Sequence, residues 1–331
     1  MALAIALRSP YYISDTAGTG ANSAKLTISI NGTIEYTLVK LTTSQGTMLW
    51  EISELCRDFI NIDNLVGLIG QTLAIITTQT SHASTDGSGT ALTTDALTFV
   101  GYDGYTDFMQ GANSTMTPSI PSWLISSNPN NTSSNDKYYI YVPVGVDGFL
   151  SYYDTSYALN RQSYNTTDIE IVGSGAGTKM NIVRIDCTKY GNGHKITFVN
   201  KYGVLQDLWF FLKSVNTTSK KQEQFQRNIV TSTGTYNTRN HTKQDYNTVA
   251  NTSISLSSGY YPEWCNQWFE ELLLSEQVWL ERLNPTTLVP EQKVPVNVRK
   301  SSMIKKTSLN ERLIDYTFEF DMSFDYINNI R

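Results

Sequence analysis

The stretch KITFVNKYGVLQDLWFFLKSV, residues 195–215, is typical of two strands joined by a turn at Lys201-Tyr202-Gly203. A half-buried strand alternates apolar and polar residues, because successive side chains point to opposite faces of the sheet. The second strand breaks this rule with four consecutive large apolar residues, Trp209, Phe210, Phe211 and Leu212. Both of its faces are therefore expected to be covered, either inside the same chain or by another chain.

The composition of the 331-residue chain is all-β in character. Charged residues make up 17% of the chain, and Thr, Ser, Asn and Tyr replace the missing charge. These residue types suit strands, turns and hydrogen-bonded surfaces. The net charge of -5 gives no overall basic field to attract nucleic acid or an anionic membrane surface, so we expect neither as a partner.

Nothing in the sequence predicts export or membrane insertion. No stretch approaches the ~20 apolar residues of a membrane span. The apolar opening, residues 1–7, lacks a basic start and is interrupted by Arg8 before it is long enough for a signal peptide. The three cysteines, Cys56, Cys187 and Cys265, lie far apart, which favours buried thiols and a reducing compartment. We expect a soluble protein that is cytosolic when made and is not addressed for export.

Residues 1–113 are predicted to form an N-terminal β-sandwich with one short helix. Residues 24–30 alternate apolar with polar side chains, and Asn31-Gly32 is a strong hairpin signal before a returning strand over residues 34–41. Strands of this length and spacing favour a two-sheet sandwich of the immunoglobulin or fibronectin kind. Apolar residues at steps of three and four in residues 49–60 predict an amphipathic helix that crosses the sandwich.

Three further modules are predicted after this sandwich. A loop rich in Pro, Ser and Asn opens a second β module over residues 114–215. Residues 216–259 are polar and are expected to form an arm or extended hairpin. Residues 260–331 are predicted to form a small α+β module, in which a helix opening at Pro262 lies on an antiparallel sheet. The chain is thus predicted to be mainly β and to contain several modules.

Two sequence patterns that can mark binding or catalytic sites are better explained here as structural features. Residues 173–179, GSGAGTK, are glycine-rich like a phosphate loop, but the spacing of the lysine is wrong and a strand pattern follows. We interpret this stretch as a turn. The histidines, His82, His194 and His241, lie in polar turns without a ligand or nucleophile at a diagnostic offset, so we expect them in surface loops.

Carboxylate pairs give no better indication of catalysis. Glu270 and Glu271 are neighbours on the predicted helix and point in different directions, so we interpret them as its solvated side. We therefore predict no catalytic residues, no metal ligands, no bound cofactor and no enzymatic activity.

Aromatic residues make up 11% of the chain, and many tyrosines fall in predicted loops and strand ends. Tyrosine rings that stack on sugars would make the protein a carbohydrate binder. Tyrosine equally suits partly wet surfaces between subunits, because it joins an apolar ring to a polar tip. The aromatic residues are spread over all modules, which favours the subunit surfaces.

Five short segments lie in order from one end of the chain to the other: residues 7–13 (LRSPYYI), 50–55 (WEISEL), 198–211 (FVNKYGVLQDLWFF), 271–279 (ELLLSEQVW) and 309–320 (LNERLIDYTFEF). Together they resemble virion structural proteins of marine and environmental tailed bacteriophages. The resemblance implies a component of the tail, neck or baseplate rather than the major capsid protein. None of the segments is a catalytic signature.

These observations lead to the hypothesis of a structural protein of a tailed-phage virion, an oligomeric ring or connector whose partners are copies of itself and neighbouring virion proteins. It would reside in the virion, and in the host cytoplasm during assembly. The alternative is a receptor-binding tail fibre or spike subunit that recognises host surface glycans, although no internal repeat is present. The predicted interface or packing anchors are large apolar residues: Leu208, Trp209, Phe210, Phe211, Leu212, Trp264, Trp268, Phe269 and Trp279.

Overall fold

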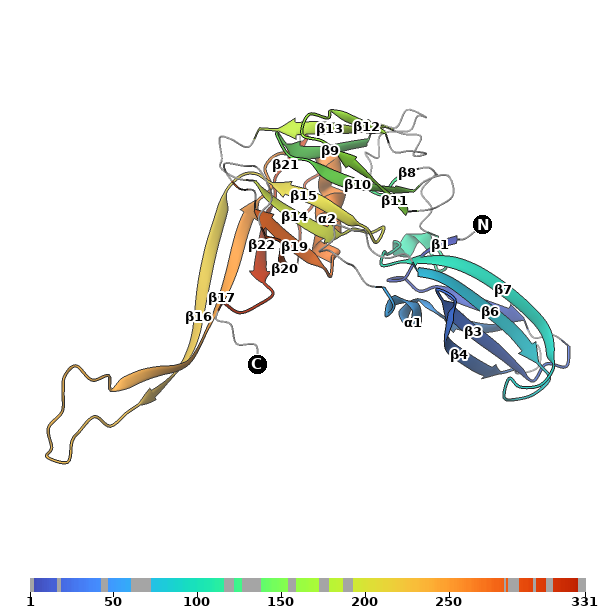
Figure 1. The fold of residues 1–331 in the computed structure, drawn as a ribbon, viewed down its shortest axis with the longest axis horizontal. Helices are drawn as coiled ribbons and strands as arrows, with labels where there is room; N and C mark the ends of the chain where they lie inside the picture. Colours follow the sequence, from blue (N-terminus) through green and yellow to red (C-terminus); the bar gives the residue numbers. More distant parts are fainter. Residues whose placement is uncertain are drawn as a thin grey trace. The chain divides into compact units, whose positions relative to one another are not determined.

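The protein is mainly β, as its sequence predicts (Figure 1). The computed structural model describes residues 3–16, 19–42, 47–60, 73–115, 122–126, 138–153, 159–172, 179–186, 193–282, 284, 292–299, 302–307 and 312–326. The chain divides into two compact units. The first comprises residues 1–186, 197–208 and 267–275, and the second comprises residues 187–196, 209–266 and 276–331.

A five-stranded sheet lies in the first unit. Its order is β1-β7-β6-β3-β4, with bounds Leu3–Ala6, Ala91–Tyr102, Leu73–His82, Ser23–Ile30 and Thr33–Leu41. β3 and β4 form the hairpin predicted at Asn31-Gly32, where φ is 50° and 87°. Positive φ at both central residues gives a turn whose twist matches that of the strands. The hairpin prediction is therefore confirmed.

A second pair of strands, β2 (Tyr12–Thr16) and β5 (Thr47–Glu51), shares a hydrophobic core with this sheet. β5 occupies the start of the stretch in which we predicted a helix over residues 49–60, and helix α1 spans only Ser53–Arg57. The prediction is wrong for residues 49–51, which belong to β5, and for residues 58–60, which follow α1. Leu49 and Trp50 alternate between solvent and core, as strand residues do. Pairing with β2 prevails there, because so short a helix has little stability of its own.

The rest of the first unit contains two three-stranded sheets. One has the order β11-β10-β8, with bounds Leu159–Tyr164, Gly148–Tyr153 and Ser122–Trp123. The other has the order β12-β13-β9, with bounds Glu170–Val172, Lys179–Ile185 and Tyr138–Pro143. A 3-10 helix, η1, covers Phe108–Gln110. Helix α2, Asn266–Leu274, contributes residues 267–274 to this unit.

A seven-stranded sheet of order β15-β14-β19-β20-β22-β17-β16 supplies most of the strands of the second unit. Residues of β14 and β15 fall in both units. In chain order the bounds are His194–Val199 (β14), Leu205–Phe210 (β15), Ser214–Gln226 (β16), Lys243–Ser257 (β17), Val278–Arg282 (β19), Val294–Val298 (β20) and Thr317–Met322 (β22). The short strands β18, Tyr261–Pro262, and β21, Leu313–Ile314, pair beside the 3-10 helix η3, Glu263–Cys265.

The predicted module boundaries and the two units divide the chain differently. Strands β19, β20 and β22 join β14 to β17 in one sheet, whereas residues 260–331 were expected to form a module of their own. Most of α2 belongs to the first unit, while the strands that follow it belong to the second. In the described part of the chain, no helix has the length and apolar character needed to cross a membrane.

The stretch at residues 195–215 forms two strands, β14 and β15, with a turn between them, as its pattern predicts. Gly203 donates its N–H to the carbonyl of Asn200 at 2.9 Å and has a φ of 74°. A Cβ at this position would lie 2.8 Å from the backbone nitrogen of Asp103, so the turn requires glycine. The apolar run that begins at Trp209 is buried mostly within its own chain.

Candidate functional site

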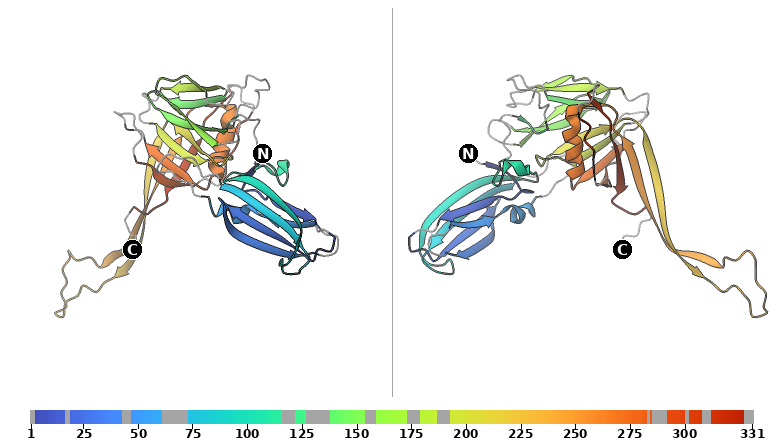
Figure 2. Two further views of the ribbon diagram at one scale, coloured as in Figure 1. Left: turned by 45° about the vertical axis from the view of Figure 1, so that its right-hand side comes forward. Right: turned by 180° about the vertical axis from the view of Figure 1, so that it is seen from behind.

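The hairpin of β16 and β17 extends far beyond the sheet to which it belongs (Figures 1 and 2). β17 pairs with β22 only over Ser253–Ser257, so along residues 219–252 its strand partner is β16 alone. We call residues 219–252 the arm. All of residues 213–247 are exposed except Ile229. The arm therefore buries very little of its own surface.

A β-bulge interrupts the pairing in the middle of the arm. The register shifts between Lys221 and Glu223, which leaves Gln222 opposite two residues of β17. One of the two, Asn247, has a φ of 49°, in the left-handed region that asparagine tolerates better than most residues. Bulges bend and twist a strand pair, and the two strands bend in Figure 1. The outer part of the arm is thus set at an angle to its base.

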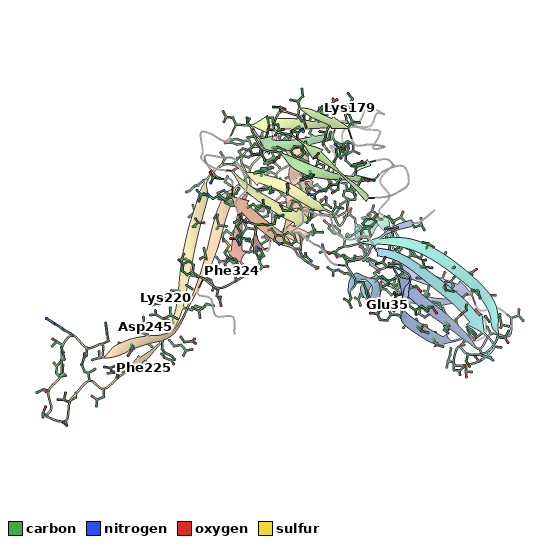
Figure 3. The ribbon with its side chains drawn as sticks, viewed as in Figure 1. Glu35, Lys179, Lys220, Phe225, Asp245 and Phe324 are labelled. Carbon is green, nitrogen blue, oxygen red and sulfur yellow. The ribbon has the colours of Figure 1, made fainter. Side chains whose placement is uncertain are left out.

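Few side-chain contacts hold the outer part of the arm. The rings of Phe225 and Tyr246 meet edge to face with centroids 5.7 Å apart, and both remain exposed. Nζ of Lys220 lies 3.2 Å from a carboxylate oxygen of Asp245, and the Gln224 amide donates to the other at 2.7 Å (Figure 3). The hydrogen bond from Gln224 and then that from Lys220 lower the pKa of Asp245.

The tip of the arm presents hydroxyl groups and one aromatic ring. Val230 and Tyr236 form an isolated bridge, and both side chains are exposed. The hydroxyls of Thr231, Thr233 and Thr235 lie within 2.9 to 3.2 Å of one another. Within the described tip, no apolar side chains pack over one another. The side chains of the tip are therefore available to a partner.

Positive charge is concentrated on the arm. Residues 219–252 contain five Lys and Arg against two Asp and Glu, in a chain whose net charge is -5. Residues 226–243 contain three basic residues and no acidic one. Sequence reasoning predicted an arm or hairpin here but interpreted Lys220-Lys221 as solvated strand ends. The signal it missed is the acid-free run across the tip.

The apolar run that was predicted to supply interface anchors is mostly interior. Leu208, Trp209 and Phe210 are each 1% exposed and Phe211 is 8% exposed, whereas Leu212 lies beyond the end of β15 and is half-buried. The Phe210 ring packs edge to face with Phe318 and Phe320, at centroid distances of 6.1 and 5.9 Å. The chain covers both faces of the strand at Leu208, Trp209 and Phe210, so these residues are packed inside the chain, while Leu212 keeps part of its surface exposed.

Tyr261 and Gly259 lie against the C-terminal end of β15. The Tyr261 hydroxyl donates to the carbonyl of Trp209 at 2.7 Å, and its ring lies 5.7 Å from that of Phe211. Gly259 has a φ of 81°, and a Cβ there would lie 2.1 Å from the Phe211 ring. The ring of Phe211 therefore fills the space that a larger residue at position 259 would need.

The anchors predicted near helix α2 are also packed within the chain. Trp268 and Phe269 are buried, and the indole N–H of Trp268 donates to the carbonyl of Ser126 at 2.9 Å. Trp264 in η3 and Trp279 in β19 are half-buried. The structure thus brings the nine predicted anchors into interior or partly covered positions and gathers none of them on the arm.

Helix α2 also carries a buried carboxylate. Glu271 is 1% exposed; the Ser126 hydroxyl donates to one of its oxygens, and the N–H of Lys201 lies 3.5 Å from the other. Burial raises its pKa to about 7, against the opposing hydrogen bond from Ser126 and the charge of Lys201. The prediction that Glu270 and Glu271 form a solvated helix side is wrong for Glu271, whose position on the helix turns it inward.

Two of the three histidines are buried, which corrects the expectation of surface loops. His82 ends strand β6 and shares a hydrogen bond with Thr80 at 2.9 Å. His194 opens β14, and burial followed by the charge of Arg282 lowers its pKa to about 4. His241 lies exposed on the arm. His82 and His194 themselves lie at strand ends, where their side chains are covered.

The cysteines and the glycine-rich stretch add no reactive centre in the described residues. Cys56 and Cys265 are free and buried, as predicted; burial raises the pKa of both thiols, to about 12 for Cys56. Cys187 and residues 173–178 lie outside the described residues. Lys179, which follows the glycines, opens β13 and lies 2.8 Å from Glu170. Among the residues described, no three His, Cys, Asp or Glu side chains gather to hold a metal ion.

The arm is long, carries a net positive charge and is almost wholly exposed along residues 219–247. No protein-family model, curated protein or solved structure matches the chain. Its function must therefore be inferred from the arm and from the resemblance of its short sequence segments.

Proposed function

We propose that the chain is a non-enzymatic structural subunit of a tailed-phage virion, an oligomeric ring or connector of the tail, neck or baseplate, in which the arm joins neighbouring proteins. Its proposed partners are other copies of the chain and adjacent virion proteins. The chain would meet these partners in the host cytoplasm during assembly and would stay bound to them in the finished particle. The N-terminal sandwich of the immunoglobulin or fibronectin kind remains part of this proposal.

The observation that carries the proposal is the uncovered arm. A two-stranded hairpin without a covering layer is at best marginally stable in water. Over residues 219–247 the arm is held chiefly by strand pairing, one ring contact and the polar contacts of Asp245, and its side chains are exposed except that of Ile229. A partner that covers it would supply the missing burial, which is the way in which extended segments commonly join protein assemblies.

The five phage-like segments support the same class of protein on separate grounds. They lie outside the arm, in residues 7–13, 50–55, 198–211, 271–279 and 309–320. Several of them contain core residues, such as Trp50, Phe210 and Phe318. The segments thus support a fold shared with tailed-phage virion proteins. The arm supports a role in contacts with neighbouring proteins.

Shortening the arm tests the proposal. Replacing residues 227–242 with Asn-Gly would join Gln226 to Lys243, which already form a cross-strand pair, through a two-residue turn. We expect the shortened protein to fold with a melting temperature within about 2 °C of wild type, because the removed residues lie outside the core. We expect it to be excluded from particles in a complementation assay with a phage that lacks its own copy of the gene.

Thr307→Ala provides the control, because it changes an exposed side chain of the second unit outside the arm. This variant should enter particles at the wild-type level. Incorporation of the shortened protein at normal yield would contradict the proposal.

A receptor-binding fibre or spike subunit is the second candidate, and the exposed Tyr236 at the tip favours it. An aromatic ring flanked by threonine hydroxyls can stack on a sugar and hydrogen-bond to it. A glycan array separates the two functions. Reproducible binding to one sugar class that Tyr236→Ala abolishes would favour the fibre, and the absence of any bound glycan would favour the connector.

A further inference from the structure

The charges of the chain are divided unevenly between its two units. The first unit contains nineteen Asp and Glu against nine Lys and Arg, a net charge of -10. The second contains eleven Asp and Glu against sixteen Lys and Arg, a net charge of +5. The arm, with five basic and two acidic residues, supplies three of these five net positive charges. Each copy therefore has one strongly acidic unit and one basic unit with a basic projection.

We propose that the arm of one copy binds the acidic first unit of a neighbouring copy. This inference rests on the proposed function, in which the arm joins subunits, and it names the partner. Complementary charge steers partners together and selects among them. A contact between the arm and an unlike surface of the next copy also propagates around a ring, as contacts between two different surfaces do.

The size of the arm suits such a contact. A stable interface uses about 20–30 residues from each partner, and residues 219–252 provide 34. The rings of Phe225, Tyr246 and Tyr236 keep 42%, 47% and 62% of their surface exposed, so each can bury on the order of 100 Å² more against a neighbour. Charge would then decide which surface the arm meets, and the aromatic rings would supply the burial that holds it.

Charge argues against two other binding partners of the arm. Edge-to-edge pairing of two arms would bring two groups of net charge +3 together, and like charges across an interface are unfavourable. A nucleic acid would meet only three basic residues in the acid-free run of residues 226–243, in a chain whose first unit carries a net charge of -10. Phosphates are repelled by such a unit, whereas a neighbouring copy offers it to the arm.

A charge-reversal experiment measures this contact in the full chain. Arg227→Glu with Arg239→Glu reverses two exposed charges of the arm, and Arg282→Glu with Lys305→Glu makes the same change in charge at exposed positions of the second unit outside the arm. Sedimentation velocity would follow self-association at about 0.05 and 0.5 M NaCl, since salt screens exposed charges. We expect the arm variant to associate about tenfold or more weakly than wild type at low salt.

The control variant should associate within about threefold of wild type, and high salt should weaken wild type far more than the arm variant. Equal weakening of both variants would overturn the inference, because net charge rather than the arm would then govern association. A wild-type chain that stays monomeric at every concentration would overturn it too. Arm-dependent binding of that monomer to a DNA duplex would identify nucleic acid as the partner.

Crosslinking identifies the surface that receives the arm. A photoreactive benzoyl-phenylalanine in place of the exposed Tyr236 would react with whatever covers the tip. Covalent dimers in which the crosslink joins position 236 to a peptide of the first unit support the inference. Crosslinks within a single chain, or between arms, overturn it.

The outcomes separate this inference from the proposed function. If wild type associates but the arm variant associates equally well, copies meet through another surface, and the structural role in the virion still stands. If the shortened arm described above enters particles normally, the proposed role of the arm itself fails, whatever the purified protein does in solution.

Discussion

Glu271 is a buried acid whose ionisation costs stability. Its pKa in the folded protein is about 7, against an ordinary value of 4.5. An acid whose pKa is raised by folding binds its proton more tightly in the native state, so stability falls as pH rises from the lower value to the higher one. The cost is absent below pH 4.5 and complete above about pH 7, where it is on the order of 3 kcal/mol.

Glu271→Gln removes this cost while it keeps an oxygen for the Ser126 hydroxyl. We expect the variant to be more stable than wild type at pH 8 and nearly equal to it at pH 5, as measured by urea unfolding. His194 acts in the opposite direction: its lowered pKa makes stability fall as pH drops from 6.5 towards 4. It is present in both proteins, so the difference between them reports Glu271. An equal gain at both pH values would contradict the assignment.

Phe210→Ala tests whether the apolar run belongs to the core. The ring is 1% exposed and packs edge to face against Phe318 and Phe320, so its loss should cost about 3–5 kcal/mol of unfolding free energy in urea. Phe225→Ala removes the same ring from the exposed arm and should leave global unfolding unchanged within about 0.5 kcal/mol. Normal stability of Phe210→Ala together with lost self-association would instead place Phe210 in an interface.

The same residues show what a sequence pattern can and cannot tell. Four consecutive large apolar residues predict that both faces of a strand are covered, because the faces alternate along it. The pattern does not say whose atoms cover them. Tyr261 and Phe318 follow Trp209 by many residues, and their approach to this strand depends on the register of distant strands, which a local pattern does not contain. Burial of Glu271 was missed for the same reason.

At the scale of elements, the turn between β14 and β15 gives a sharp prediction. Gly203→Ala adds a Cβ 2.8 Å from the backbone of Asp103 at a φ of 74°. Gly234→Ala meets nothing within 4 Å at a nearly equal φ of 73°, on the exposed tip of the arm. We expect Gly203→Ala to lower the thermal midpoint of unfolding more than Gly234→Ala, because Gly234→Ala adds only the strain of a Cβ at positive φ. Equal effects would mean that backbone conformation, rather than the close approach, requires the glycine.

Elements were predictable where local chemistry decides them. The Asn31-Gly32 hairpin and the turn at Lys201-Tyr202-Gly203 follow from the residues within each turn. The helix predicted over residues 49–60 failed at its start because β2, more than thirty residues earlier, provides strand pairing there. Local spacing competes with such long-range pairing, and the pairing prevailed.

At the scale of the whole molecule, the mainly β composition was readable from the start, but the division into two units was not. Both units are built from segments far apart in the chain, and helix α2 falls in a different unit from the strands that follow it. The opposite net charges of -10 and +5 become visible only after these segments are grouped. A sequence read from end to end averages them to -5.

The few contacts that hold the arm would affect how fast the proposed assembly forms. Segments with few buried contacts open locally at little cost in free energy, far below that of global unfolding. In the proposed assembly, each arm would have to become ordered when it meets a neighbouring copy. That ordering cost would slow every step of association and lower the affinity of each contact.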